Sequence, residues 1–328
     1  MRPQIRGSNI LVTGGAGFIG SHLVDRLLDE GACEVVVIDN LFLGSEANLE
    51  SAMARGAILY KDDAEIATSL EYIFEKHEID IVFNAATKAL NYSFVNPKNA
   101  FDTNTTVILN LLEQQRKGAF KTLCHFSTSE VYGTAVYEPM DEQHPLHPTT
   151  TYAAGKAAAD IALETWVRMF GLDAFIVRPF NNYGPRQNHK GCLAGVIPIT
   201  LKRIVDGGTP EIHGTGKQSR DFIFVLDTVD AIVKAYGKLA PAEAVNISTD
   251  GQVSIEELIT TICAKVGYKG EILRKPARNS DVECHNASNA KVRAMIDYRL
   301  TPWESGLQQT IDWYMKLFGA KPQSGAKQ

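Results

Sequence analysis

The sequence predicts an α/β fold built on a doubly wound parallel sheet, and three observations support this prediction. The first is a glycine-rich turn that connects a short apolar strand, residues 10–13, to an amphipathic helix, residues 21–30. The second is Asp39, which ends the next apolar strand about 20 residues after the glycines. The third is the alternation of strand-like and helix-like segments through the first half of the chain, which is typical of parallel sheets.

The glycine-rich turn has the pattern of a dinucleotide-binding loop. Such a loop must turn tightly, let the backbone approach a pyrophosphate and start a helix against the strand. Each of these requirements favours glycine, which has no side chain. The helix that follows offers free N–H groups and partial positive charge to the anion. The candidate cofactor residues in this turn are Gly14, Gly17, Phe18, Ile19 and Gly20.

Asp39 indicates which dinucleotide is bound. An acid at this position accepts hydrogen bonds from a ribose, and the residues after it are Asn40 and Leu41 instead of an Arg. A 2′-phosphate beside an unpaired carboxylate is repelled. The sequence therefore predicts NAD in preference to NADP, with Asn40 as a further candidate contact.

The remaining elements of the first half follow in order, separated by polar segments. The predicted strands are residues 57–60, 79–83, 121–126 and 174–178, and the predicted helices are residues 70–77, 100–116 and 152–170. Residues 43–56 are polar and are expected to form a mobile segment. Ligands on such sheets bind beyond the carboxyl ends of the strands, so the segments at those ends should converge on one crevice. These segments are the glycine turn, Ala85 with Ala86, residues 127–130 and residues 178–179.

The alternation loosens in the second half. Helices are predicted at residues 196–206, 255–266 and 303–318, and a strand at residues 244–248. We therefore expect an NAD-binding Rossmann domain over residues 1–179, to which some later segments return. A smaller, mixed α/β substrate-binding region is expected over residues 180–328.

The composition narrows the class of protein. The chain has 328 residues, of which 45% are hydrophobic and 22% charged, as in ordinary soluble globular proteins. A net charge of -5 argues against a nucleic-acid partner, and no apolar run is long enough to predict a membrane span. The five cysteines are scattered, which favours reduced thiols in the cytoplasm. His144 and His147 have no third ligand nearby, so no metal is predicted.

Tyr152 and Lys156 are the candidate catalytic pair. They lie four residues apart and so share one helix face. A tyrosine is a poor base at neutral pH, but a lysine cation and a cationic nicotinamide both favour the phenolate. The phenolate can then take a hydroxyl proton while a hydride leaves the same carbon. The pair opens a helix soon after the strand-end residues Ser127 and Thr128, which favours an active site over a surface pair.

Together these motifs resemble the extended short-chain dehydrogenases that modify nucleotide sugars. The resemblance rests on the glycines, Asp39, the Ser127–Thr128 pair, Tyr152 with Lys156, and residues 178–186, and it extends over nearly the whole chain. It implies tightly held NAD, a nucleoside-diphosphate sugar as substrate and transient oxidation at C4 of the sugar.

The resemblance also implies residue roles. Thr128 would hydrogen-bond the C4 oxygen, Tyr152 would act as the base, and Lys156 would hold the nicotinamide ribose. The adenine contact falls on Asp62 or Asp63. The implied substrate residues are Ser129, Asn182, Arg186, Arg220 and Arg278. Lys88 departs from the usual family pattern, and its place at a strand end would let it meet a carboxylate or phosphate, unless it is simply solvated.

The segment after Thr128 bears on the reaction. Epimerases of the family usually have a small residue in place of Glu130, whereas dehydratases typically have Asp-Glu, in which Glu removes the C5 proton and Asp protonates the C6 hydroxyl. Here Ser129 replaces the Asp. The Thr-Ser-Glu form resembles UDP-glucuronate decarboxylases and the dehydratases of the legionaminic acid pathway. Glu130 could also be a structural carboxylate that accepts a bond from a backbone N–H.

The leading expectation is therefore an NAD-dependent nucleotide-sugar 4,6-dehydratase, which is a lyase. The alternatives are a UDP-glucuronate decarboxylase, a UDP-sugar 4-epimerase and, more remotely, a non-catalytic NAD-binding module. A homodimer is also expected, because two long helices carry apolar residues on more than one face. These residues are Phe101, Leu109, Ile161, Trp166 and Val167.

Overall fold

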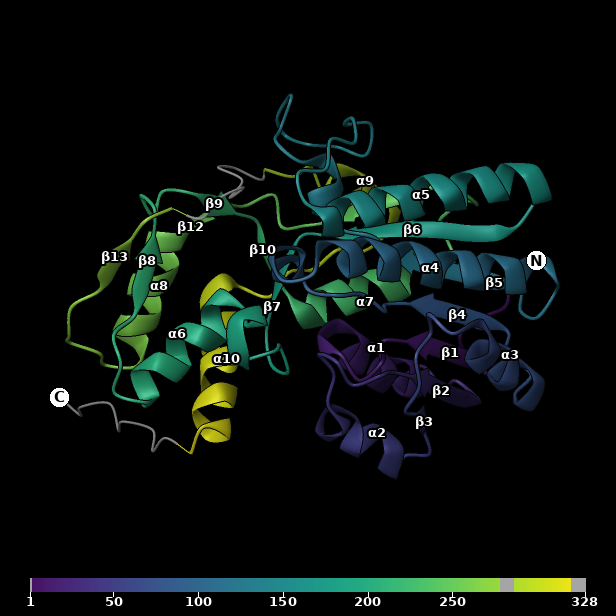
Figure 1. The fold of residues 1–328 in the computed structure, drawn as a ribbon, viewed down its shortest axis with the longest axis horizontal. Coiled ribbons are helices and arrows are strands. Elements are labelled where there is room, and N and C mark those ends of the chain that lie inside the picture. The colour runs from purple at the N-terminus through teal and green to yellow at the C-terminus, as the bar shows by residue number, and fades with distance from the viewer. Residues whose placement is uncertain (1, 278–285, 320–328) are drawn as a thin grey trace.

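The computed structural model describes residues 2–277 and 286–319 and contains one large parallel sheet (Figure 1). The strand order in the sheet is β3-β2-β1-β4-β5-β6-β11. The strands are β1 (Asn9–Thr13), β2 (Glu34–Ile38), β3 (Ile58–Tyr60), β4 (Ile81–Asn84), β5 (Thr122–Phe126), β6 (Asp173–Pro179) and β11 (Ala244–Ile247). The strand order runs outward from β1 in one direction to β3 and in the other direction from β4 to β11. This reversal of the strand order is the switch point of a doubly wound Rossmann sheet, so the predicted fold class is confirmed.

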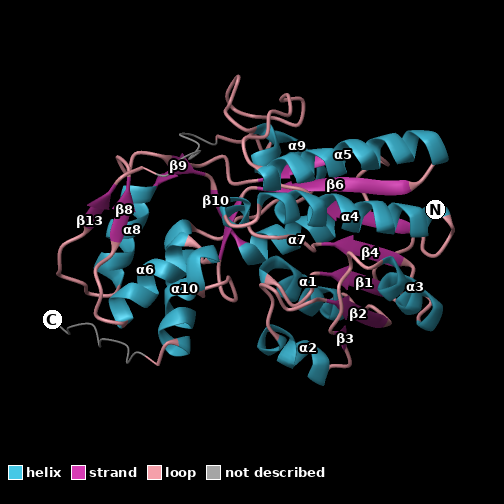
Figure 2. Ribbon diagram, in the orientation of Figure 1, coloured by secondary structure: helices cyan, strands magenta, loops and turns pink. Residues whose placement is uncertain are grey.

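Helices cover both faces of this sheet (Figure 2). Two apolar clusters fill the space between the helices and the sheet. One face carries α1 (Phe18–Asp29), α2 (Glu50–Ala54), α7 (Val225–Ala235) and α9 (Ala290–Met295). The other carries α3 (Ala67–Lys76), α4 (Pro97–Arg116) and α5 (Thr151–Phe170). The strands alternate between the faces, as Val12 packs into the first cluster and Leu11 into the second. Near-continuous burial on both faces explains why the strands read as apolar runs.

The last strand of the sheet comes from the second half of the chain. β11 pairs with β6 in parallel, with Ala244 opposite Ile176. The helix α7 crosses the sheet before it, and sequence reasoning did not identify that helix. The later half therefore contributes both a strand and helices to the sheet.

The rest of the second half forms a smaller region beside the carboxyl ends of the strands (Figure 1). Its helices are α6 (Val196–Val205), α8 (Ile255–Lys265) and α10 (Trp303–Leu317). Its strands pair two by two: β7 (Asn181–Tyr183) with β10 (Phe222–Phe224), β8 (Glu211–His213) with β13 (Leu273–Lys275), and β9 (Ser219–Arg220) with β12 (Val253–Ser254). A separate apolar cluster around Tyr183, Leu201 and Leu258 holds this region together.

Four short 3₁₀ helices complete the described structure, and one of them corrects an expectation. They are η1 (Glu46–Leu49), η2 (Leu90–Phe94), η3 (Ser129–Tyr132) and η4 (Gly191–Leu193). The polar segment at residues 43–56 was expected to be a mobile loop, but it contains η1 and α2. Leu49 and Ala52 are both 0% exposed and attach it to the core. Two small apolar anchors are too weak a pattern to be read as a helix from sequence.

The helices α4 and α5 pack closely because α5 has a glycine at their contact. A Cβ atom on Gly155 would lie 2.8 Å from the backbone oxygen of Phe101 and 3.1 Å from the Cβ of Asn104. The side chain of Asn104 also donates a hydrogen bond to the backbone oxygen of Tyr152 at 3.2 Å. The first turn of α5 is therefore held in place by α4.

This contact predicts that Gly155→Ala destabilises the protein, although alanine favours a helix by about 1 kcal/mol. The added methyl group meets a backbone oxygen that cannot move aside, so the free energy of unfolding should fall by about 1–3 kcal/mol. Chemical denaturation measures this change. The matched control is Gly237→Ala, where no atom lies within 4 Å of the added Cβ. Equal stability of Gly155→Ala and the parent protein would contradict the packing argument.

Candidate active site

One large cleft lies at the carboxyl ends of the sheet strands and extends into the smaller region. Its volume is about 580 Å³. The segments expected to converge there largely do so, because the cleft is lined by the glycine turn, Ala85 with Ala86, residues 127–130 and Pro179, whereas Arg178 does not line it. Asp39 lines the cleft as well. Among the residues that the structure describes, no group of three or more His, Cys, Asp or Glu could hold a metal ion.

The glycine turn leaves room for a pyrophosphate at the start of α1. Gly14 has a φ of +68°, and a Cβ on it would lie 2.7 Å from the backbone of Ala86 on the neighbouring strand loop. Gly17 is the N-cap of α1 and provides no side-chain cap for the helix. The first N–H groups of the helix therefore remain available to an anion, as a dinucleotide requires.

Asp39 joins this turn to the loop after β2. Its Oδ2 accepts a hydrogen bond from the backbone N–H of Ala16 at 2.9 Å, and its Oδ1 accepts one from Leu41 at 2.8 Å. Burial raises the pKa of Asp39, while these backbone bonds lower it. The carboxylate lies in the cleft where a ribose bound beside the glycine turn would reach it.

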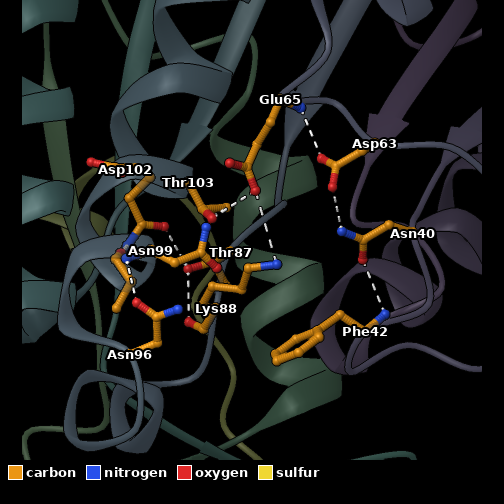
Figure 3. Close-up of polar contacts among 12 residues, drawn as sticks. Asn40, Phe42, Asp63, Glu65, Thr87, Lys88, Asn96, Asn99, Asp102 and Thr103 are labelled. Atoms are coloured by element: carbon orange, nitrogen blue, oxygen red, sulfur yellow. Dashed lines mark hydrogen bonds and ion pairs between the residues drawn. The ribbon is translucent and has the colours of Figure 1, made fainter.

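Asp63, and not Asp62, lines the cleft. Its Oδ2 accepts a hydrogen bond from the side-chain amide of Asn40 at 2.7 Å (Figure 3). Of the two acids expected at the adenine contact, Asp63 is therefore the one that lines the cleft, and Asn40 lies beside it.

Lys88 is buried in the cleft and is not a solvated lysine, being only 6% exposed. Its Nζ lies 4.2 Å from the centre of the Phe42 ring and 3.9 Å from Oε1 of Glu65 (Figure 3). The same Glu65 oxygen accepts a hydrogen bond from Thr103 at 2.7 Å. Phe42 follows β2 and Glu65 follows β3, so Lys88 lies toward the cofactor half of the cleft.

The four candidate catalytic residues lie together in the middle of the cleft. Thr128 is the N-cap of η3, and its hydroxyl accepts a hydrogen bond from the backbone N–H of Glu130 at 3.3 Å. Tyr152 stands in the first turn of α5, and its phenol is hydrogen-bonded to the side chains of Thr128 and Thr87. Glu130 is close enough to Tyr152 to disfavour its phenolate. Ser129 lies between Thr128 and Glu130 and is buried.

Burial controls the protonation of Tyr152 and Lys156. It raises the pKa of Tyr152 to about 12, although the bonds from Thr128 and Thr87 act in the opposite direction. It lowers the pKa of Lys156 to about 8, although the nearby Asp160 favours the cation. The Nζ of Lys156 donates a hydrogen bond of 2.7 Å to the backbone oxygen of Phe126. The phenol needs an additional positive charge before it can act as a base at neutral pH.

A buried polar network supports these residues from below. Asp160 follows Lys156 by one helical turn, is 0% exposed, and forms an ion pair with Arg178 at 3.1 Å. Its Oδ2 also accepts a hydrogen bond from Ser127 at 2.8 Å. Arg178 in turn donates to the hydroxyl of Tyr132 at 3.0 Å. Sequence reasoning did not select Asp160, although its position four residues after Lys156 places it on the same helix face.

The expected substrate residues separate into three groups. Asn182 and Arg220 line the cleft in the smaller region. Arg186 does not line it; its guanidinium forms an ion pair with Asp25 of α1 at 2.7 Å, which directs it away from the site. Arg278 lies outside the described residues.

The cysteine and histidine interpretations have different outcomes. Cys124 is fully buried in β5, and burial raises the pKa of its thiol, so its interpretation as a core residue is confirmed. His144 does lie in a loop, but its ring is 2% exposed and accepts a hydrogen bond from the backbone N–H of Val136. It therefore fixes the loop before α5.

The buried cation predicts a pH-dependent stability. The unfolded chain binds a proton at a lysine up to about pH 10.4, whereas Lys156 in the folded protein loses it at about 8, so its contribution to stability rises with pH between these values. Lys156→Met removes the buried charge. The gain in stability of the cofactor-free variant over the cofactor-free parent should therefore be larger at about pH 7 than at about pH 9.5. The difference between the two gains should be about 2 kcal/mol in the free energy of unfolding.

Urea denaturation at both pH values measures this difference. The control is Lys98→Met on α4, whose side chain is 86% exposed and whose effect should be the same at both pH values. A pH-independent effect of Lys156→Met would contradict the assignment of a costly buried cation.

Comparison with known proteins gives the family. The model of the NAD dependent epimerase/dehydratase family matches residues 10–248. The chain is 32% identical over 307 residues to a UDP-glucose 4-epimerase of Mycolicibacterium smegmatis, covering 93% of this chain and 97% of that protein. It is 30% identical over 317 residues to UDP-glucuronic acid decarboxylase 1 of Xenopus tropicalis, covering 94% and 72%.

A solved structure extends the comparison to a third reaction. The dTDP-glucose 4,6-dehydratase of Streptomyces venezuelae, crystallised with NAD bound, is 28% identical and superimposes with a TM-score of 0.89 over 95% of this chain and 98% of that one. The chain therefore belongs to the NAD-dependent epimerase/dehydratase family, whose members are nucleotide-sugar epimerases, dehydratases and decarboxylases.

Proposed function

We propose that the protein is an NAD-dependent nucleotide-sugar 4,6-dehydratase. The observation that carries this proposal is the carboxylate of Glu130, which lies in the cleft beside Thr128 and Tyr152. Oxidation and reduction at C4 alone require no such acid. The glycine turn, the uncapped start of α1 and Asp39 fit NAD, which accepts a hydride from the sugar and later returns it.

The first step is the loss of the C4 hydroxyl proton. Thr128 holds the C4 oxygen, and the Tyr152 phenolate takes the proton as the C4 hydrogen leaves as hydride. Lys156 contributes a positive charge that stabilises this phenolate. The bond from Lys156 to the oxygen of Phe126 fixes the amino group beneath the reaction centre.

The second step uses Glu130. A C4 ketone makes the C5 proton acidic, and the Glu130 carboxylate removes it. The C6 hydroxyl then leaves as water with a proton, forming a C5–C6 double bond. Because Ser129 stands where the family dehydratases have an Asp, we assign that proton to Glu130, which passes on the one it has just taken. C6 would then regain the hydride, and C5 would gain a proton equivalent to the one that Tyr152 took from the C4 hydroxyl, so that the net change is the loss of one water.

A UDP-glucuronate decarboxylase is the second candidate, and Ser129 is the observation that favours it. Loss of carbon dioxide from a C4-keto uronate needs no proton donor to a C6 hydroxyl, so a Ser is sufficient there. A 4-epimerase and a non-catalytic NAD-binding module are the further alternatives. Product masses from a panel of UDP-, dTDP-, GDP- and CDP-sugars separate loss of water, loss of carbon dioxide and unchanged mass, while no turnover indicates the module.

The proposal predicts that Tyr152 and Glu130 act in separate steps. Tyr152→Phe should abolish all chemistry because no base remains for C4. Glu130→Gln should keep NAD bound and still oxidise C4, which appears as absorbance of the reduced nicotinamide without product. Turnover of this variant should fall by at least about 100-fold, as expected for loss of a general base.

The control for this experiment is Glu164→Gln, which changes a partly buried carboxylate of α5 that pairs with Arg168 and does not line the cleft. It should retain full turnover. Near-normal turnover of Glu130→Gln would show instead that Glu130 is structural, and the 4-epimerase reading would then be the better one.

We also propose that the protein is a homodimer that pairs α4 and α5 with their copies. Phe101, Leu109 and Ile161 are 36%, 42% and 57% exposed on these two adjacent helices. Trp166 is half-buried, and Val167 faces the core instead of the surface, which reduces the apolar set expected from sequence. An exposed apolar surface formed by two long helices fits a second copy of the same surface.

This proposal predicts that Ile161→Arg yields a monomer, because a charge at the centre of the paired helices would be desolvated without a partner. Light scattering at micromolar concentration measures the mass. Met53→Arg on α2 is the control, since Met53 is also exposed but lies on another surface. A monomeric parent protein, or a dimeric Ile161→Arg variant, would refute the interface.

The four cysteines in the described part of the chain are all free thiols. In the same part, no helix combines the length and the apolar character that a membrane crossing requires. We propose that the enzyme acts in the cytoplasm, where thiols remain reduced.

A further inference from the structure

Three side chains that the proposed chemistry does not use lie in the half of the cleft formed by the smaller region. They are Arg203 on α6 and Glu211 and His213 on β8. A guanidinium nitrogen of Arg203 lies 2.8 Å from Oε2 of Glu211, and Nε2 of His213 lies 3.2 Å from the same oxygen. These groups offset one another's charge, and because they still line the cleft they can also contact a ligand bound there.

The layout of the cleft gives the position of the substrate's nucleoside, and this step rests on the proposed function. The cofactor occupies the half around the glycine turn and Asp39, and the sugar lies at Thr128 and Tyr152 in the middle. The nucleoside therefore extends into the remaining half. Ile255 and Val196 also line that half and are only partly buried, so they provide apolar surface against which a flat base can pack.

Glu211 is an acceptor in this half of the cleft. Partial burial acts to raise its pKa, but the charge of Arg203, the hydrogen bond from His213 and the charge of Lys275 outweigh it and hold the pKa below its usual value. An ionised carboxylate only accepts hydrogen bonds and has about four acceptor positions. The closest contacts of Arg203 and His213 both use Oε2, so Oε1 can accept bonds from a ligand.

Arg203 and His213 occupy both acceptor positions of Oε2, so the two open positions lie on Oε1, and the Arg203 guanidinium beside them is a donor. Guanine has the complementary groups on one edge, namely the N2 amino group, N1–H and O6. Uracil and thymine present a single N–H between two carbonyl oxygens, so one of these would face a carboxylate oxygen. Cytosine and adenine present one amino group beside an unprotonated ring nitrogen, which would also face the carboxylate.

We propose that the substrate is a guanosine-diphosphate sugar, with Glu211 accepting hydrogen bonds from N1–H and the N2 amino group and Arg203 donating to O6. A site built this way rejects other bases because their carbonyl oxygens or ring nitrogens face the carboxylate. His213 keeps the Glu211 carboxylate oriented from the other side.

Binding of free nucleoside diphosphates to the NAD-loaded protein tests this proposal without requiring turnover. Calorimetry should show GDP binding tighter than UDP, dTDP and CDP by on the order of 10- to 100-fold. Inosine diphosphate, which lacks only the N2 amino group, should bind about tenfold more weakly than GDP. Equal or tighter binding of UDP, dTDP or CDP would overturn the proposal.

A carboxylate variant isolates the contact. In Glu211→Gln the amide oxygen is the only acceptor left for Arg203, so an NH2 donor faces the guanine N–H groups; GDP binding should weaken by at least about tenfold and the difference between GDP and inosine diphosphate should disappear. The matched control is Glu256→Gln on α8, which pairs with Arg274 and does not line the cleft. A Glu211→Gln protein that keeps the parent's preference for GDP would overturn the proposal.

The two proposals fail in distinguishable ways. Selective binding of GDP without turnover of any guanosine-diphosphate sugar would reject the proposed reaction and support the base assignment. Turnover of a UDP- or dTDP-sugar with loss of water, together with tight binding of that nucleotide, would support the proposed reaction and reject the base assignment.

Discussion

The active site depends on one buried carboxylate, Asp160. It is the only acid among the described residues that contacts Arg178, and Lys156 lies on the same helix face one turn earlier. One anion thus faces two cations, so the region beneath Tyr152 carries net positive charge. Removing one partner of such a buried pair leaves the charge of the other uncompensated, so a substitution at either position is costly. This charge favours a phenolate but does not suffice for it, because burial still raises the pKa of Tyr152 to about 12.

The neutral members of the same layer keep this charge arrangement in place. Thr13, Asn84 and His125 are neighbours in register across β1, β4 and β5. Thr13 donates to Oδ1 of Asn84 at 2.7 Å, and the amide of Asn84 lies 3.1 Å from Nδ1 of His125. Burial and the two nearby cations hold the pKa of His125 well below its usual value. A neutral imidazole therefore lies 3.7 Å from Asp160 without adding a third cation.

The features that could be predicted from the sequence are those whose residues lie close together in the chain. The glycine turn, Asp39 and the Tyr152–Lys156 pair each have a local spacing that follows from a turn, a strand end or a helix face. The fold class followed because alternating strands and helices admit few topologies.

The features that could not be predicted join distant segments. The ion pair of Arg186 with Asp25 spans 161 positions, and no local pattern distinguishes it from a substrate contact. The burial of Lys88 depends on Phe42 and Glu65, which come from two other loops. The pair formed by Arg203 and Glu211 likewise arises where α6 packs beside β8.

The separation of these elements explains how one fold supports different reactions. The groups proposed to choose the reaction, Thr128 to Glu130, lie at the end of β5, where Thr128 is the N-cap of η3. The groups proposed to contact the nucleoside lie on α6 and β8, in a region with its own apolar core. Different apolar clusters support the two sets. Relatives near 30% identity can therefore be epimerases, dehydratases or decarboxylases with the same sheet, and base selection can change without a change in chemistry.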